Sequence, residues 1–595
     1  MRPRRILGVP ENAGSGTVRL SPHALHPMDS TLELLDWIIV AAYFAAVAAV
    51  VALAVRRERA RSETQTAEGF FLGGRSVTWG VVGASLFASN IGSEHLVGLA
   101  GSGASSGMAP MHFEVLASLI LLLLGWVFVP FYLRSGVFTM PEFLERRYGP
   151  AARWYLALIS IVAYVLTHIS VTVYAGATVV TTLTGISFWT AAVAVILATG
   201  LYVLVGGLLA VVYADTIQVT VLIAGAIAVT VTGLILAGGF DAVAATSPEG
   251  YFDVWKPVDH PSYPWTGIIF GAPLLGIWYW CTEQNIVQRT LAAKSVDHAR
   301  RGAIFAGFLK LLPAFILVLP GVIAYTLVQQ GQLVLPARPM GGGPNYDATL
   351  PALVAQLLPI GIRGLVVAGM FAALMGSLAA VFNSCATLVT WDIYRKFRPN
   401  ASEKRLVWVG RLSTVGLVGL GLAWIPMMGA FQEGQLYTYL QSIQAYISPP
   451  IASVFLLGVG WKRANAQGAM AALLSGFVLG LGRVLLELNR DSLAEGGMLQ
   501  AFATLNFLHF AIALFATCTA ILIVVSLLTP APDEDKIAGL TFATADKRPA
   551  DQTPADGMPS DAPREVVSDP AWRRTDLRLT AALIACVAVV WLIFS

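Results

Sequence analysis

Residues 78–107 form a long apolar stretch that polar residues and glycines interrupt in its middle. The interruption holds Asn90, Glu94 and His95, followed by a run rich in Gly and Ser. Backbone that leaves its helix inside a bilayer must line protein or a water-filled cavity, because each unpaired peptide group facing lipid costs several kcal/mol. Ionisable side chains at that depth mark a functional site by default. The stretch therefore predicts a broken membrane helix that lines a pathway for a solute and an ion.

The composition places the rest of the chain in the membrane as well. Only 12% of the 595 residues are charged and 56% are hydrophobic, whereas soluble domains carry about 25% charged residues. We therefore expect membrane lipid around the protein. The formal net charge of +3 is too small to indicate a nucleic-acid partner. The four cysteines lie in apolar runs and suggest buried thiols rather than disulfides or a metal site.

Apolar runs of about 20 residues predict an all-α polytopic membrane protein with about 14 transmembrane helices. The predicted spans are 33–55, 78–107, 113–133, 154–180, 186–206, 215–238, 264–287, 303–327, 358–391, 408–430, 437–459, 467–488, 505–528 and 579–594. Arg and Lys concentrate after the first, third, seventh, ninth and eleventh spans. The positive-inside rule makes these loops cytoplasmic and places both termini on the extracytoplasmic side.

Two of the spans carry interruptions, and they lie five helices apart. The second is 264–287, which has Pro273 and Gly276 in its interior. Transporters built from inverted repeats often place a broken helix at the corresponding position of each repeat. We therefore expect a 5+5 inverted repeat in which each repeat opens with its broken helix.

The predicted divisions of the chain are a disordered N-terminal tail (1–30), an extra N-terminal helix (31–57), a first inverted repeat (78–238), a second inverted repeat (264–459), two additional helices (467–528), a disordered cytoplasmic linker (529–577) and a last helix (578–595).

Short segments along the chain resemble one family of membrane proteins. In order, they are 83–93 (GASLFASNIGS), 134–144 (RSGVFTMPEFL), 206–218 (GGLLAVVYADTIQ), 278–289 (WYWCTEQNIVQR), 382–384 (FNS), 392–394 (DIY) and 441–443 (QSI). Between about Phe70 and Arg483 the sequence is similar to the sodium/glucose cotransporters of the solute:sodium symporter family. The resemblance implies the leucine-transporter fold and sodium-driven uptake by alternating access.

The resemblance also implies a sodium site beside the first break. It assigns three backbone carbonyls and one hydroxyl as ligands, from Ala88, Ile91, Ala373 and Ser377. Gly376 stands where relatives usually carry another serine, so a water or a backbone carbonyl would have to replace one hydroxyl ligand. The other interpretation of these small residues is that they let helices pack closely.

Three further positions bear on ion coupling. The resemblance implies that Asp215, which begins the sixth span, lines the inner exit path of the ion. An acid at this position would equally suit a helix N-terminus, where the helix dipole stabilises it. Ala379 and Ala380 stand where relatives with a second sodium site carry hydroxyls, so we expect one sodium per sugar.

A sugar presents several hydroxyl groups and apolar ring faces, so its pocket needs polar side chains and an aromatic platform. Several predicted spans supply such side chains, and the resemblance aligns most of them with sugar-contacting positions: Asn90, His95, Phe113, Glu114, Tyr279, Trp280, Lys310, Tyr437 and Gln441. It also implies that Tyr279 closes the pocket from the inside. Gly276 stands where relatives place Thr or Asn against the sugar, so the preferred stereoisomer need not be that of glucose or galactose.

Each of these residues also has a purely structural interpretation. A lone His or Gln in a membrane often makes an interhelical hydrogen bond. Lys310 could extend to the membrane interface, and Glu114 could pair with a base. The Trp-Tyr-Trp run at 278–280 could belong to an aromatic belt. Glu94 adds a carboxylate beside His95, and its simplest interpretation is pairing with a nearby base.

These observations predict a plasma-membrane secondary transporter that couples inward sodium flow to uptake of a hexose or a similar sugar. The alternatives are a sodium- or proton-coupled symporter for inositol, a sugar acid or another small solute, and a sensor that binds solute without moving it. An enzyme is not expected, because the eight histidines have no metal-ligand spacing and no nucleophile–base pair stands out.

Overall fold

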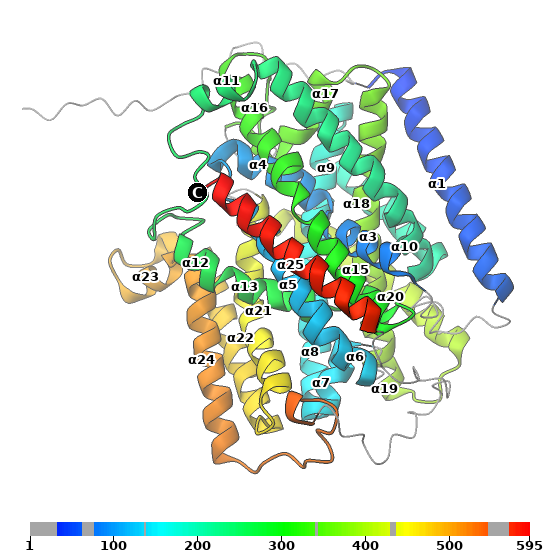
Figure 1. Cartoon of the computed structure of the whole chain (residues 1–595), viewed down its shortest axis with the longest axis vertical. Helices are drawn as coiled ribbons and strands as arrows, with labels where there is room; N and C mark the ends of the chain where they lie inside the picture. The colour runs from blue at the N-terminus through cyan, green and yellow to red at the C-terminus, as the bar shows by residue number, and fades with distance from the viewer. Residues whose placement is uncertain (1–31, 62–76, 136–138, 339–342, 429–435, 545–569) are drawn as a thin grey trace, which may run out of the picture.

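The computed structural model describes residues 32–61, 77–135, 139–338, 343–428, 436–544 and 570–595. Over these ranges the chain folds into helices, and they contain no β-strand (Figure 1). Ten helical stretches in the described ranges are long and apolar enough to cross a membrane. The all-α polytopic class is therefore confirmed, whereas the count of fourteen helices stays a prediction.

The first interrupted helix is broken where the sequence predicts. α3 (Trp79–Asn90) ends and α4 (Ser93–Ser106) begins across Ile91 and Gly92. Ile91 has φ −77° and ψ 72°, and Gly92 has φ −88° and ψ −169°, so neither residue continues the helix. Both residues are buried. The break therefore lies inside the protein, where its freed backbone groups are shielded from lipid.

The second interrupted helix breaks later than its sequence suggests. It consists of α12 (Trp265–Phe270), α13 (Ala272–Gly276), a π-helical turn (Ile277–Thr282) and α14 (Gln284–Leu291). The break falls at Glu283, whose ψ of 130° is extended. Pro273 lies in the first turn of α13, where its missing N–H removes no helical hydrogen bond. Gly276 is helical too, so neither residue makes the break.

Longer helices surround the two interrupted ones. They are α5 (Met111–Leu123), α8 (Pro150–Tyr164), α9 (Ser170–Thr184), α10 (Phe188–Ala237), α15 (Val296–Leu309), α16 (Leu319–Gln329), α18 (Ile362–Thr387), α20 (Glu403–Met428) and α21 (Leu436–Gly460). Shorter helices occupy the connections: α6 (Val129–Ser135), α7 (Met140–Tyr148), α11 (Phe240–Thr246), α17 (Thr349–Leu357), α19 (Arg395–Phe397) and α23 (Met498–Thr504).

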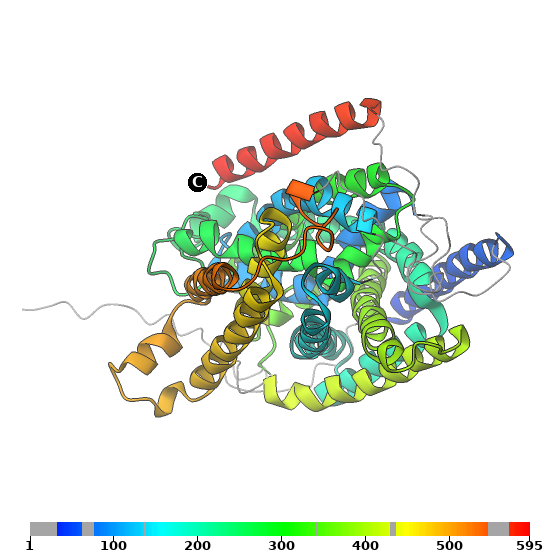
Figure 2. The ribbon, with the colours of Figure 1, turned by 90° about the horizontal axis from the view of Figure 1, so that it is seen from below.

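Four helices lie outside this bundle. α22 (Ala466–Leu488) and α24 (Phe507–Leu528) pack beside α21, at the lower left of Figure 1. α1 (Leu34–Arg61) lies at the right edge, and α25 (Pro570–Ile593) crosses the front. Seen from below, α1 and α25 both lie on the outside of the bundle (Figure 2).

α10 replaces two predicted spans. The sequence predicts separate helices at 186–206 and 215–238, but the structure has one helical element over Phe188–Ala237. Gly206 and Gly207 lower helix propensity by about 1 kcal/mol each, which weakens a helix without ending it. No proline lies in this stretch to remove a hydrogen bond. The side chains of residues 202–216 lie outside the described residues.

Glycines after the first break let helices approach each other. A Cβ placed on Gly103 of α4 would lie 2.3 Å from the carbonyl oxygen of Val318, and one on Gly321 of α16 would lie 2.1 Å from that of Ala100. Contacts this short are open only to glycine, and small residues at helix crossings are typical of membrane bundles. The Gly- and Ser-rich half of this stretch therefore serves helix packing on α16, rather than lining a pathway.

α1 is fixed to the bundle by a buried carboxylate. Asp36 pairs with Arg363 of α18 (Oδ2–Nη2, 2.6 Å) and accepts hydrogen bonds from the backbone N–H groups of Gly361 and Gly364 (2.8 and 3.0 Å). Asp36 is fully buried. The ion pair and its backbone donors satisfy the charge, which a buried carboxylate requires.

α25 is fixed in a similar way at its beginning. Asp576 pairs with Arg300 and Arg301 at the start of α15 (3.0 and 2.7 Å). At its other end, the carbonyl of Phe594 accepts a hydrogen bond from the N–H of Val254 (3.2 Å). The sequence predicts this last helix over 578–595, and the structure shows that it begins earlier, at Pro570.

The linker predicted over 529–577 differs from expectation where the structure describes it. Residues 529–544 pack against the helices: Ile537 and Leu540 are buried, and the ring of Phe542 lies 5.3 Å from that of Phe131. These apolar side chains explain why the segment is not a free linker. Residues 545–569, and residues 1–31 with the predicted N-terminal tail, lie outside the described residues.

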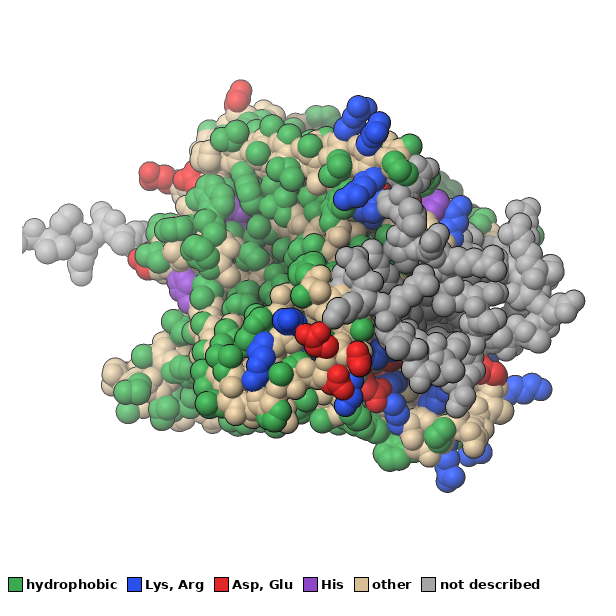
Figure 3. All heavy atoms as spheres, turned by 60° about the horizontal axis from the view of Figure 1, so that its bottom comes forward, with side chains coloured by type: hydrophobic (Ala, Val, Ile, Leu, Met, Phe, Trp, Pro, Cys, Tyr) green, Lys and Arg blue, Asp and Glu red, His purple; other side chains and the backbone are tan. Residues whose placement is uncertain are grey.

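Two of the family-like motifs meet at the intracellular side predicted from the basic loops. Thr139 begins α7 and accepts a hydrogen bond from the N–H of Glu142 (3.2 Å), while its hydroxyl donates to Asp392 (2.9 Å). Arg153 also donates to Asp392 (2.6 Å). Figure 3 shows Lys and Arg side chains mostly in the right half and lower centre of the visible face, among broad areas of hydrophobic surface.

On the opposite side, a turn over Tyr346–Ala348 packs against α4 and the start of α21. A Cβ on Gly101 of α4 would lie 2.7 Å from the carbonyl oxygen of Tyr346. Asp347 is buried and accepts a hydrogen bond from the N–H of Leu436 (3.4 Å). Burial raises the pKa of the Asp347 carboxyl to about 7.

Candidate functional site

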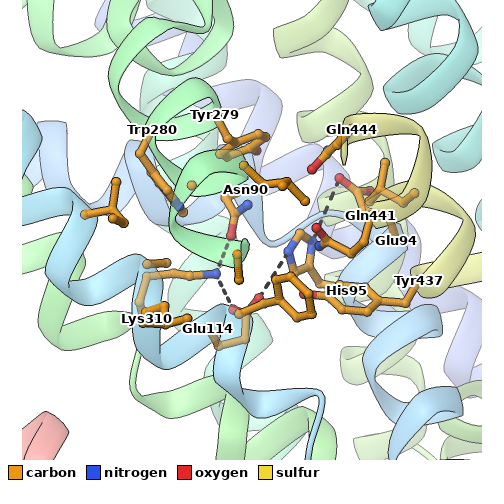
Figure 4. Close-up of a pocket in the computed structure, with 18 of the residues that line it drawn as sticks. Asn90, Glu94, His95, Glu114, Tyr279, Trp280, Lys310, Tyr437, Gln441 and Gln444 are labelled. Carbon is orange, nitrogen blue, oxygen red and sulfur yellow. Dashed lines mark hydrogen bonds and ion pairs between the residues drawn. The ribbon is translucent and has the colours of Figure 1, made fainter. Parts of the chain in front are cut away.

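A cavity lies beside the first break, lined by residues of α3, α4, α5, α13 and α21 and by Lys310 at the end of α15 (Figure 4). Its volume is about 560 Å³ when the space open to solvent is counted. The structure brings all nine predicted solute-site residues to its wall: Asn90, His95, Phe113, Glu114, Tyr279, Trp280, Lys310, Tyr437 and Gln441. Their role in binding stays a prediction.

A buried network of charges forms one wall of the cavity. Lys310, just after α15, donates from Nζ to the carboxylate of Glu114 on α5 and to Oδ1 of Asn90, the last residue of α3. Nε2 of His95 lies 3.4 Å from Oε1 of Glu114. Lys310 and Glu114 are 1% and 2% exposed, so Lys310 points inward and does not reach the interface. The predicted pairing of Glu114 with a base is present, and it lies at the cavity wall.

Aromatic rings close the cavity on two sides. Nζ of Lys310 lies 5.4 Å from the ring centroid of Trp280, a cation–π distance. Trp280 and Tyr279 are buried at the cavity wall, which argues against an aromatic belt at the membrane interface. On the other side, the ring centroid of Tyr437 lies 5.8 Å from that of Phe113. The cavity thus combines hydroxyl-binding groups with apolar ring faces, as a sugar site requires.

Several cavity residues were missed by sequence reasoning. Gln444 lies three residues after Gln441 on the same face of α21, a spacing that could have revealed it. His168 belongs to the π-helical turn between α8 and α9, and its Nε2 lies 3.1 Å from Oε1 of Glu283 at the second break. No local sequence signal connects these two residues. Gly276 lines the cavity, where a Cβ would lie 3.1 Å from Cγ1 of Ile120.

Side-chain hydroxyls bind two backbone carbonyls near the second break. The hydroxyl of Tyr132 donates to the carbonyl of Cys281 (2.7 Å). The hydroxyl of Thr282 donates to the carbonyl of Trp278 (2.8 Å). The carbonyls of Cys281 and Trp278, which precede the extended residue Glu283, are in this way bound by side chains of the protein itself.

At the first break, two backbone carbonyls lose their helical partners. The N–H of Gly92, which would close a helical turn on the carbonyl of Ala88, donates instead to the carbonyl of Asn90 (2.8 Å). The N–H of His95, which would do the same for Ile91, donates to the carbonyl of Gly92 (3.1 Å). The carbonyls of Ala88 and Ile91 are therefore the ones that this break releases from the helical pattern.

Ser377 of α18 faces this break. A Cβ on Gly92 would lie 2.6 Å from Oγ of Ser377, so the close approach of α18 requires glycine at position 92. The Ser377 hydroxyl donates to the carbonyl of Ala373 (3.0 Å), which leaves the lone pairs of its oxygen able to contact a cation. Gly376 is buried beside it and offers no hydroxyl.

The structure thus places the Ser377 hydroxyl of α18 next to Gly92 in the first break. Binding of an ion by Ala88, Ile91, Ala373 and Ser377 stays a prediction. Asp215 lies within α10, but its side chain is outside the described residues. Its predicted place on the ion exit path therefore also stays a prediction.

Comparison with known proteins connects this geometry to a family. The model of the sodium:solute symporter family matches residues 70–476. Sodium/glucose cotransporter 1 of Oryctolagus cuniculus is 40% identical over 500 residues, which cover 79% of this chain and 76% of that protein. The sodium/myo-inositol cotransporter of Homo sapiens is 38% identical over 557 residues, covering 87% of this chain and 76% of that protein.

The fold is similar to that of a solved Na⁺-coupled sialic acid symporter in a substrate-bound, outward-open state. The TM-score is 0.68 at 21% sequence identity, over 84% of this chain and 99% of the symporter. The family match covers most of the chain and includes both breaks, the cavity and α18. The chain therefore belongs to the sodium:solute symporter family.

Proposed function

We propose that the protein is a sodium-coupled symporter that takes up a hexose or a similar sugar across the plasma membrane by alternating access. The observation that carries this proposal is the first break. On one side of it, the carbonyls of Ala88 and Ile91 lose their helical partners, and Ser377 lies next to Gly92 in the same break. On the other side, Asn90 takes part in the polar network of the cavity. The short segment 88–91 therefore contacts both the ion and the solute.

This arrangement suggests how the ion and the solute are coupled. A sodium ion held by the carbonyl of Ile91 would fix the backbone next to Asn90, and so would order a side chain that contacts the sugar. An ordered pocket binds the sugar with a smaller entropic cost, and by linkage the sugar then favours the ion by the same factor. The ion therefore shifts the population toward the state that binds sugar, and joint occupancy favours closure.

The cavity wall supports a polyhydroxylated solute. Asn90, Gln441 and Glu114 offer both donors and acceptors, and Lys310 is a charged donor. Trp280 and Tyr437 offer ring faces. We assign the orientation of the protein in the membrane from the basic loops, and this orientation puts both termini on the extracytoplasmic side. The 5+5 inverted repeat, with one broken helix opening each repeat, is part of the same proposal.

A second candidate solute is myo-inositol. The chain is as similar to sodium/myo-inositol cotransporters as to sodium/glucose cotransporter 1, at 38–40% identity. Gly276 leaves one part of the cavity wall without a polar side chain, which removes one contact that would distinguish sugar stereoisomers.

Uptake into proteoliposomes tests the proposal. Purified protein is supplied with labelled glucose, galactose, myo-inositol and a sugar acid, in sodium or in choline buffer. We expect sodium-dependent accumulation of at least one solute, and strongly reduced uptake for Gln441→Ala, Glu114→Ala and Lys310→Ala. Ser377→Ala should raise the sodium concentration for half-maximal uptake. Sodium-independent uptake, or wild-type transport by all three cavity variants, would refute the assignment; binding without flux would indicate a sensor.

A further inference from the structure

Glu94 is a buried carboxylate at the start of α4, and the solute network does not account for it. It is 2% exposed. Its Oε2 accepts a hydrogen bond from the hydroxyl of Thr172 on α9 (3.2 Å), and its Oε1 lies 3.9 Å from Nδ1 of His95, which is too far for a hydrogen bond. No lysine or arginine of the described chain lies within ion-pair distance of it. A buried carboxylate needs a cationic partner to remain charged.

The Glu94 carboxylate lies beside the predicted ion site. A Cβ on Gly92 would be 2.4 Å from Oε2 of Glu94 and 2.6 Å from Oγ of Ser377. The two oxygens are therefore no further apart than the sum of these distances. Oxygen ligands sit about 2.3–2.6 Å from Ca²⁺, a cation of nearly the same radius as Na⁺. A single ion can accordingly contact both oxygens.

The same carboxylate also borders the solute cavity. His95 lies between the two acids, with Nδ1 toward Glu94 and Nε2 toward Glu114 (Figure 4). Thr172 holds Glu94 from the side of α9. Glu94 therefore lines the cavity and also lies close to Ser377.

We propose that Glu94 supplies a carboxylate ligand to the transported cation and replaces the hydroxyl that Gly376 lacks. This inference rests on the proposed sodium coupling of the same site. With the ion bound, the ion is the cationic partner of Glu94. When the ion leaves, His95 is the nearest group able to pair with the carboxylate, and His95 is also the neighbour of Glu114. Departure of the ion therefore changes the electrostatics of the solute pocket through one side chain.

Direct binding of ²²Na⁺ to the purified full-length protein tests this role independently of transport. Glu94→Gln keeps the size of the side chain and removes its charge. We expect its sodium affinity to fall at least tenfold, about 1.4 kcal/mol. The double variant Glu94→Gln/Gly376→Ser should bind sodium at least threefold more tightly than Glu94→Gln alone. Glu94→Asp, which keeps the charge but withdraws the oxygens, should lose less than Glu94→Gln.

Glu487→Gln is the matched control. Glu487 is a helical carboxylate of α22 that accepts a hydrogen bond from the hydroxyl of Tyr446 (2.6 Å), remote from the break. The sodium affinity of the Glu487→Gln variant should stay within twofold of that of the wild type. An unchanged affinity in Glu94→Gln, or an equal loss in Glu94→Asp, would overturn the role of Glu94 while leaving sodium symport intact. A wild-type protein that binds no ²²Na⁺ would overturn the proposed sodium coupling itself.

Discussion

Replacing Lys310 by methionine should separate what the buried network does for the fold from what it does for the solute. The ammonium donates to Glu114 and Asn90, and none of the three side chains is more than 5% exposed. Its loss leaves the charge of Glu114 without its lysine partner, with His95 at 3.4 Å. Removing one partner of a buried ion pair costs about 3–5 kcal/mol, because the other charge stays buried.

The double variant Lys310→Met/Glu114→Gln removes both charges. Its stability should recover most of that loss, since no unpaired charge then stays buried. Solute affinity should not recover. A hydrogen bond from a charged group contributes about 1.5–3 kcal/mol, so the half-saturating solute concentration should rise about 10- to 150-fold in both variants.

Thermal unfolding in detergent and concentration-dependent uptake in proteoliposomes measure the two effects. Lys462→Met is the control: its ion pair with Glu534 is exposed at 3.5 Å, and its loss should cost no more than about 1 kcal/mol. The reasoning fails if the double variant unfolds as early as the single one. It also fails if the half-saturating solute concentration of Lys310→Met equals that of the wild type.

Three other variants probe the scaffold. Gly103→Ala places a Cβ 2.3 Å from the carbonyl of Val318, so it should lower the yield of folded protein in size-exclusion chromatography, whereas Gly80→Ala on α3, with nothing within 4 Å, should not. Arg363→Met leaves Asp36 buried with backbone donors alone, and should lower the melting temperature more than the exposed Lys462→Met. The pKa of Asp347 is raised to about 7 from an ordinary value of 3.8, so its contribution to stability is present at low pH and is lost as the pH rises through about 7. Asp347→Asn should therefore weaken the dependence of the melting temperature on pH between pH 5 and pH 8. An unchanged slope of melting temperature against pH would contradict the assignment.

The sequence predicts those parts of the site that depend on a short stretch of neighbouring residues. The first break follows from polar residues inside an apolar run, and it is found at Ile91–Gly92. All nine predicted solute residues line one cavity, because the family resemblance carries their spatial relation along with their identity. Residue spacing alone could not pair Lys310 with Glu114, which lie 196 positions apart.

The failures have physical reasons of their own. Pro273 looks like a helix breaker, but in a first turn it costs nothing, and the second break falls at Glu283 instead. The glycines at 101 and 103 look like loosened backbone, although their lack of a side chain serves helix contact. Both errors come from residues whose effect depends on the neighbouring helix rather than on the local sequence.

The two breaks differ in how their polar atoms are used. At the second, the hydroxyl of Tyr132 donates to the carbonyl of Cys281, whereas at the first the N–H groups of Gly92 and His95 bond elsewhere than to the carbonyls of Ala88 and Ile91. With a single cation carried per cycle, each uncharged solute molecule crosses with one elementary charge. A tenfold sodium ratio and 100 mV then supply about 1.4 and 2.3 kcal/mol, which limits accumulation to roughly 500-fold. A carrier with two such ions would reach the square of that ratio, so under the proposed one-ion coupling the first break sets how steeply the cell can concentrate its solute.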